Sequence, residues 1–163
     1  MRRLSGLLVV LAILPDLDVL GFYAGIPYGH PLGHRGVTHS LAFALVLGFG
    51  SAAMSFRDVS MCGARGLRVA LLCSLACASH GILDAITDAG LGVGFFLPFD
   101  DARYFFGWRP LRTSPLSIGA FMSRNGLAIL ANEAWYVGIP TAVAAALSLS
   151  LRQALSRTSS SAS

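Results

Sequence analysis

Four apolar runs, each nearly free of charged residues, constrain the fold of this chain more than any other feature. They cover residues 4–14 with an extension toward Phe22, Thr38 to about Phe56, Leu67 to about Ala89, and Ala134 to Leu151. A transmembrane helix needs about 20 predominantly apolar residues. Only 12% of the 163 residues are charged, whereas soluble domains carry about 25%. The sequence therefore predicts an all-α, polytopic membrane helical bundle with about four transmembrane helices.

The connections between the runs differ in character. Residues 21–33 are rich in glycine and proline and predict a loop, and residues 100–117 predict a polar loop. Residues 91–99 are too short to cross a bilayer, so we expect a re-entrant or interfacial segment there. Ser117 to about Asn132 predicts an interfacial amphipathic helix, and Pro140 predicts a kink in the fourth span.

One domain accounts for almost the whole chain in this interpretation. We expect a single membrane-embedded domain over residues 1–155, and no internal repeat divides it. Residues 156–163 are rich in serine and predict a disordered tail.

The distribution of the arginines predicts how the chain is oriented in the membrane. All 12 basic residues are arginines, scattered between the apolar runs without the basic stripe that would track a nucleic acid, so we expect no nucleic-acid partner. Cytoplasmic loops carry an excess of positive charge. A cytoplasmic N-terminus places seven arginines inside (Arg2, Arg3, Arg57, Arg65, Arg68, Arg152 and Arg157) and five outside (Arg35, Arg103, Arg109, Arg112 and Arg124).

Three polar clusters interrupt the apolar pattern, and this topology brings them to the same depth. Ionisable groups within membrane segments are costly and are functional candidates. His80 is about 12 residues into the third span, or about 18 Å, and therefore lies in the outer half. The clusters are Asp16 and Asp18 in LPDLD, His34 and His39 in HRGVTHS, and His80 and Asp84 in HGILD. We expect them to form one site toward the outer face of the membrane.

These six residues are candidate metal ligands. His80 and Asp84 are four residues apart and leave the same helix face. An extended backbone would point Asp16 and Asp18 to opposite sides, whereas a turn would bring both to one cation. His39 is expected in the first turns of the second span, with Thr38 near its N-cap.

Mixed histidine and aspartate ligation without cysteine suits zinc, manganese or iron. Six candidate ligands are enough for one or two divalent ions. Such an ion activates a water, and Asp16, His39 and Asp84 are the candidates to move its proton. The guanidinium of Arg35 could hold a phosphate or carboxylate of the substrate.

The chain also resembles a known family. The segments LPDLD, HRGVTHS and HGILDAIT, followed by LPFDDARYFF, SPLSI and the pair Glu133 and Trp135, are similar to those of the YdjM-like, membrane-bound metal-dependent hydrolases. The resemblance covers roughly residues 7–140. It implies a bacterial inner-membrane hydrolase with a helical metal site and a distant likeness to zinc-dependent phospholipase C. It also implies that Arg35 and Arg103 lie beside the ligands or bind substrate.

One departure from the family concerns the first helix. Family members often carry a Thr-His pair near its start, and residues 1–13 contain no histidine here. This leaves the number of metal ions open.

Three functions remain in competition. The favoured one is a metal-dependent hydrolase acting on a phosphoester or lipid-like substrate at the outer face, with membrane lipid as its neighbour and a small molecule or lipid as its substrate. The alternative is a non-enzymatic membrane protein that binds or conducts a divalent cation. The third is a structural bundle whose polar residues lock helices together. No protein partner is predicted.

Overall fold

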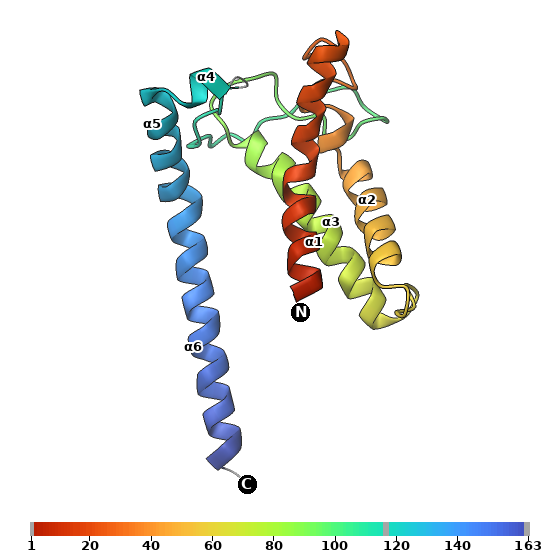
Figure 1. Ribbon diagram of the computed structural model, residues 1–163, viewed down its shortest axis with the longest axis vertical. Helices are drawn as coiled ribbons and strands as arrows, with labels where there is room; N and C mark the ends of the chain where they lie inside the picture. The colour runs from red at the N-terminus through yellow and green to blue at the C-terminus, as the bar shows by residue number, and fades with distance from the viewer. Residues whose placement is uncertain (1, 116–117, 162–163) are drawn as a thin grey trace. The chain divides into compact units, whose positions relative to one another are not determined.

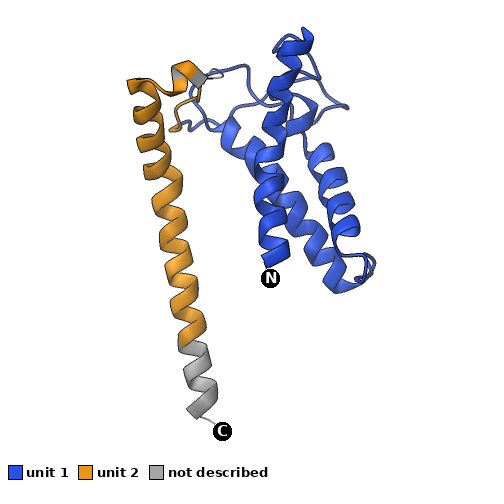
Figure 2. Ribbon diagram, viewed as in Figure 1, with its two compact units in different colours: residues 1–109 blue, residues 110–163 orange. Residues whose placement is uncertain are grey.

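The computed structural model describes residues 2–115 and 118–161. It divides into two compact units, residues 1–109 and residues 110–163, and each is described by itself (Figure 2). The single domain expected over residues 1–155 stays a prediction.

The first unit is built from three main helices (Figure 1). Helix α1 (Arg2–Ile13) continues directly into a 3₁₀ helix, η1 (Leu14–Ala24). A short 3₁₀ turn, η2 (Val37–His39), leads into α2 (Leu41–Ser55), and α3 (Ala64–Ala85) returns beside it. All regular elements in the described residues are helical, which confirms the predicted all-α class.

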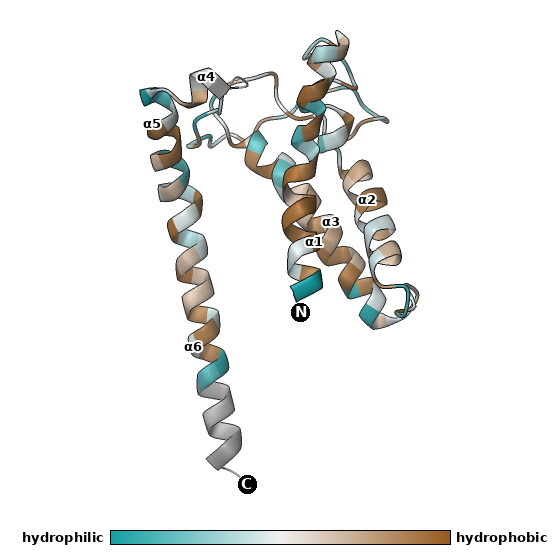
Figure 3. Ribbon diagram, viewed as in Figure 1, coloured by the Kyte–Doolittle hydropathy of each residue, from teal (hydrophilic) through white to brown (hydrophobic). Residues whose placement is uncertain are grey.

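Three helical stretches are long and apolar enough to cross a membrane: Arg2–Ala24, Ala64–Ala85 and Arg124–Gln153 (Figure 3). The second predicted span is shorter than expected. Helix α2 has 15 residues, or about 22 Å against a hydrocarbon thickness of about 30 Å. It begins late because Ser40 is its N-cap, with Ser40 Oγ accepting a hydrogen bond from the backbone N–H of Phe43. The cap lies two residues after Thr38, which was predicted near it, whereas His39 lies in η2 and not in the first turns of the helix, where it was expected.

Small residues hold α2 against α3. Ala44, Gly48 and Ala52 are spaced by four residues and are all buried. On α3 they face a second buried series that includes Ala70 and Ser74. A Cβ on Gly48 would lie 2.4 Å from the backbone nitrogen of Ser74. Small residues at this spacing let membrane helices approach closely, where van der Waals contact replaces the hydrophobic drive.

The core of the first unit lies between the polar clusters and the N-terminal end of α1. It comprises Leu11 of α1 together with buried residues of α2 and α3, namely Ala44, Ala52, Ala70, Cys73 and Cys77. The guanidinium of Arg3 lies 5.4 Å from the ring centroid of Phe56, so the start of α1 and the end of α2 share one end of the unit. The polar clusters therefore lie at the other end.

Residues 86–109 follow α3 and form turns. Val93 and Tyr104 pair through two backbone hydrogen bonds of 2.9 Å, an isolated antiparallel bridge. Residues 91–99, expected to be re-entrant or interfacial, lie within this turn-rich segment.

In the second unit the helices α4 (Ile118–Phe121) and α5 (Arg124–Glu133) precede a π-helix, η3 (Ala134–Gly138), and α6 (Ile139–Ser161). The predicted interfacial helix and fourth span are therefore not separate, because α5 runs through η3 into α6. The π-helix ends two residues before Pro140, where a kink was expected. Helix α6 extends through Ser161 over a stretch predicted to be disordered, and Ala162 and Ser163 lie outside the described residues.

The close contact between α2 and α3 gives a stability prediction. Gly48→Ala should lower the unfolding free energy by about 1–3 kcal/mol through overpacking, a fall in Tm of about 4–10 °C. A Cβ on Gly50 of the same helix would meet no atom within 4 Å, so Gly50→Ala is the matched control and should not lower Tm. Thermal unfolding of the two variants in detergent makes the comparison, and equal Tm values would contradict the tight approach.

Candidate metal centre

The 3₁₀ conformation of η1 separates the two aspartates. With three residues per turn, successive side chains are about 120° apart. Pro15 and Asp18 share the buried face, whereas Leu17 and Leu20 share the exposed face. Asp16 lies on the edge between these faces, and its side chain is 53% exposed against 2% for Asp18. The two carboxylates therefore meet different partners.

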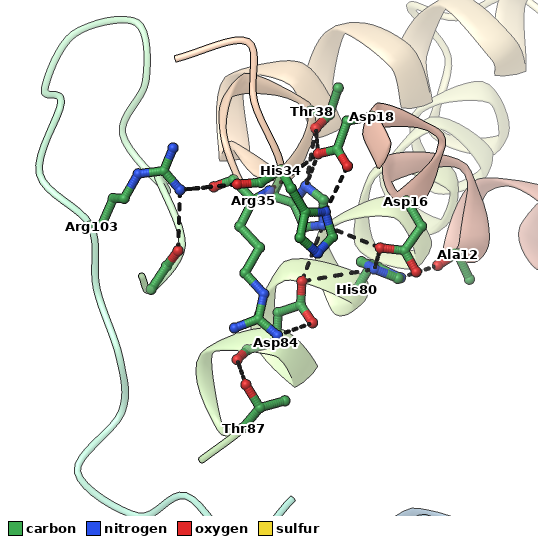
Figure 4. Close-up of polar contacts among 12 residues, drawn as sticks. Ala12, Asp16, Asp18, His34, Arg35, Thr38, His80, Asp84, Thr87 and Arg103 are labelled. Atoms are coloured by element: carbon green, nitrogen blue, oxygen red, sulfur yellow. Dashed lines mark hydrogen bonds and ion pairs between the residues drawn. The ribbon is translucent and has the colours of Figure 1, made fainter. Parts of the chain in front are cut away.

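Four side chains converge beside this edge (Figure 4). Asp16 comes from η1, His39 from η2, and His80 and Asp84 from the last turns of α3. One ligand atom from each lies within 4.8 Å of all the others. The Nε2 atom of His80 is 3.0 Å from Asp16 Oδ1 and 3.9 Å from Asp84 Oδ2. The Nε2 atom of His39 is 3.8 Å from Asp16 Oδ1 and 3.1 Å from Asp84 Oδ2.

These separations fit one metal ion. Ligands placed about 2.0–2.1 Å from a tetrahedral ion are about 3.3–3.4 Å from one another, and the four distances fall on both sides of that value. His39 Nε2 and Asp84 Oδ2 are buried and make no hydrogen bond, although they are only 3.1 Å apart. Buried polar atoms are normally satisfied, so this pair marks a place where a cation would supply the missing interaction.

The histidines are held with Nε2 directed at this group. His80 Nδ1 donates to the backbone carbonyl of Ala12 at 2.8 Å. His39 Nδ1 faces Thr38 Oγ1 at 3.0 Å and Asp18 Oδ2 at 3.1 Å. A proton on each Nδ1 leaves the lone pair on each Nε2. This is the usual arrangement of a metal-bound histidine, whose second nitrogen donates to a carbonyl or carboxylate.

Asp18 joins η1 to the segment that carries the histidines. Its Oδ1 accepts from His34 Nδ1 at 2.7 Å. Its Oδ2 accepts from Thr38 Oγ1 at 2.7 Å and from the backbone N–H of Arg35 at 3.2 Å. His39 Nδ1 lies 3.1 Å from Asp18 Oδ2 and forms an ion pair with this carboxylate when the ring is protonated. Asp18, His34 and His39 form a second group that could hold an ion, but both oxygens of Asp18 already have hydrogen-bond donors.

Arg35 lies inside the site and not on its surface. It is 3% exposed, and its guanidinium donates to Asp84 Oδ1 at 3.2 Å and to the carbonyl of Ala89 at 3.0 Å. Its φ is 59°, in the left-handed region, which costs a non-glycine residue about 1–2 kcal/mol. Surrounding contacts compensate for this strain, because the Arg35 carbonyl accepts from Gly94 N–H at 2.9 Å.

Arg103 holds the loops over the site through hydrogen bonds to their backbone carbonyls. Its Nη1 donates to the carbonyls of His34, Arg35 and Gly92, and its Nη2 donates to those of Tyr28 and His30. These contacts fix the segment that precedes η2. The expectation that Arg103 binds substrate is not tested by them.

The charges of the site favour a cation. Asp16, Asp18 and Asp84 carry three formal negative charges, and Asp84 is paired with the guanidinium of Arg35. Burial by itself would lower the pKa of His39, but the negative charges of the neighbouring Asp16, Asp18 and Asp84 carboxylates outweigh burial and raise it from 6.5 to about 10. Without metal, a proton on His39 thus supplies part of the positive charge that this site requires.

The structure brings all six predicted ligands into contact, directly or through His39. It divides them into Asp16, His39, His80 and Asp84 on one side and Asp18 and His34 on the other. Their roles as ligands remain predictions. His30 does not join them, because it is exposed and its Nδ1 accepts from the backbone N–H of Leu32.

Sequence reasoning missed three contributors. The hydroxyl of Thr38 and the carbonyl of Ala12 orient the two histidines. Gly81 is the third, since a Cβ there would lie 2.9 Å from the His39 carbonyl. A glycine directly after His80, in an otherwise helical run, was the available signal for this close approach.

Fold and site together define a polytopic helical membrane protein with a cluster of aspartates and histidines that could hold a metal ion. The chain belongs to the YdjM inner membrane protein family, whose profile matches residues 2–157. Inner membrane protein YbcI of Escherichia coli (strain K12) is 35% identical over 132 residues, which cover 81% of this chain and 75% of that protein. No solved structure matches the chain.

The contacts of Asp18 give the second prediction. Asp18→Asn keeps the shape but removes the negative charge beside His39 Nδ1 and replaces one acceptor oxygen by an NH₂ group, so the His39 ring is held less firmly. Metal affinity should fall by about 10–100-fold, the usual cost of losing the group that orients a metal-bound histidine. The exposed Asp58 provides the control, and Asp58→Asn should bind metal like the parent chain. Metal titration of both variants in detergent measures this, and unchanged affinity in Asp18→Asn would contradict the orienting role.

Proposed function

We propose that this protein is a membrane-bound, metal-dependent hydrolase. One divalent ion is held by Asp16, His39, His80 and Asp84, with zinc, manganese or iron as the candidates. The substrate is a phosphoester or lipid-like molecule. The location is the bacterial inner membrane, and the distribution of arginines favours a site at its outer face.

A single observation supports this proposal most strongly. The buried atoms His39 Nε2 and Asp84 Oδ2 lie 3.1 Å apart without a hydrogen bond, inside a set of four atoms with the spacing of metal ligands. Two nitrogen and two oxygen donors without a thiolate suit a catalytic ion better than a structural zinc.

The residues of the candidate metal centre have different chemical roles in this proposal. A divalent ion lowers the pKa of a water and polarises the bond to be cleaved. His39 and Asp84 hold the ion from the buried side, and Arg35 occupies the second oxygen of Asp84. Asp16 is the most exposed of the four, and its Oδ1 faces the histidines. Its second oxygen is therefore our candidate to accept the proton of the attacking water.

Metal content tests the first half of the proposal. Elemental analysis of protein purified in detergent should find one divalent ion per chain. His80→Ala should lose it, whereas His30→Ala, which changes a histidine outside the cluster, should keep it. A parent chain without any divalent metal would overturn the proposal.

Hydrolysis tests the second half. The metal-loaded protein should cleave a substrate in a screen of phosphodiesters, phosphomonoesters and lipid esters, and Asp16→Asn should lower kcat by at least about 100-fold, as expected for a lost proton acceptor. Metal binding without turnover in the whole screen would favour the alternative, a protein that binds or conducts a cation. Metal-dependent flux into liposomes would then distinguish conduction from binding.

Chelation should also destabilise the fold. A ligand at 100 times its Kd stabilises the native state by about 2.7 kcal/mol, and the ion joins η1, η2 and α3. Removal of the metal should therefore lower Tm by about 5–11 °C. Restoring the ion should restore the Tm, and His80→Ala should show no change on chelation.

A further inference from the structure

The candidate metal centre is most exposed at Asp16, which lies on a membrane-spanning segment. The side chain of Asp16 is 53% exposed, that of His39 is 0% and that of Asp84 is 17%. Asp16 belongs to the apolar span Arg2–Ala24. The accessible side of the centre is therefore a face of a transmembrane segment.

Apolar side chains surround Asp16 on that segment. Ile13, Leu17 and Leu20 are 63%, 61% and 59% exposed, and they lie three residues before, directly after and four residues after Asp16. On the exposed face of a membrane span, such side chains meet lipid acyl chains. The opening at Asp16 is thus bordered by a surface that favours hydrocarbon over water.

The opposite side of the centre is covered by protein. His34 and Arg35 are 6% and 3% exposed, and Arg103 ties the carbonyls of both residues to that of Gly92. The loops at this end therefore form a fixed cover, and the exposed edge at Asp16 is the more open approach.

The depth of the centre matches that of lipid head groups. Helix α3 has 22 residues, or about 33 Å, close to the hydrocarbon thickness of about 30 Å. Asp84 is its penultimate residue. If α3 crosses the bilayer, the centre lies at one boundary between hydrocarbon and head groups.

Exposed aromatic side chains gather at the same end of this unit. They come from the end of η1 and from the turns after α3, and they are Tyr23, Phe96, Phe99, Phe106 and Trp108. Aromatic residues are enriched at the boundary between membrane and water. Their position agrees with the depth inferred from α3.

We propose that the substrate is a membrane-resident amphiphile that reaches the centre laterally from the bilayer. Its polar, cleavable head group meets the centre at Asp16, and its apolar chain lies along Ile13, Leu17 and Leu20. This inference rests on the proposed hydrolase function and narrows its substrate class to lipids. A water-soluble ester with the same reactive group is a poor substrate because nothing holds it at the apolar opening.

Turnover of paired substrates tests this route. Metal-loaded protein in vesicles should hydrolyse a long-chain phospholipid ester or phosphodiester at least about 10-fold faster than a short-chain soluble analogue with the same scissile bond. Leu17→Asn should lower the ratio of long-chain to soluble turnover by about 10-fold. Leu67→Asn changes an exposed leucine near the other end of α3 and should leave that ratio unchanged.

A spectroscopic measurement separates this inference from the hydrolase function. With Mn²⁺ in the centre, lipids spin-labelled near the head group should relax faster than lipids labelled near the chain end, and His80→Ala should abolish the difference. If this enhancement occurs without any hydrolysis, the lateral opening stands and the hydrolase proposal fails. If soluble analogues are hydrolysed as fast as lipids and Mn²⁺ does not affect lipid labels, the lateral route is wrong and the hydrolase function stands.

Discussion

The carboxylate of Asp18 is the interaction on which the polar end of this protein depends. It is almost fully buried, accepts hydrogen bonds from His34, Thr38 and the backbone of Arg35, and lies within ion-pair distance of His39. A charge in the membrane interior is costly without such partners. Through it the first span fixes both the path of residues 34–39 and the orientation of the His39 ring, so the candidate metal ligands are held in place by the protein itself.

The 3₁₀ helix η1 gives the two aspartates different environments. Runs of 3₁₀ helix longer than three or four residues are uncommon. Here 11 residues adopt this form. The three-residue period directs Asp18 into the protein and leaves Asp16 on the edge beside the exposed leucines. The same conformation therefore supports both a buried, orienting carboxylate and an accessible candidate ligand.

Small side chains determine how closely the helices that carry the ligands can approach. Gly48 lets α2 approach α3, and Gly81 lets the turn at His39 approach His80. Larger residues at either position would widen a ligand set whose members now lie within 4.8 Å of one another. The packing of small residues therefore also sets the spacing of the polar cluster.

The helical membrane class and the convergence of the polar clusters at one end could be predicted from the amino-acid sequence alone. This is possible because helix length, hydropathy and the alternating direction of successive spans fix the depth of each residue. The contacts of each polar residue, in contrast, emerge only from the folded chain. Asp18 is buried against the histidines while Asp16 is accessible, Arg35 turns inward to Asp84, and Arg103 binds loop carbonyls. These outcomes depend on the 3₁₀ period of η1, the left-handed backbone at Arg35 and distances of about 3 Å between segments far apart in the chain, none of which hydropathy or residue spacing encodes.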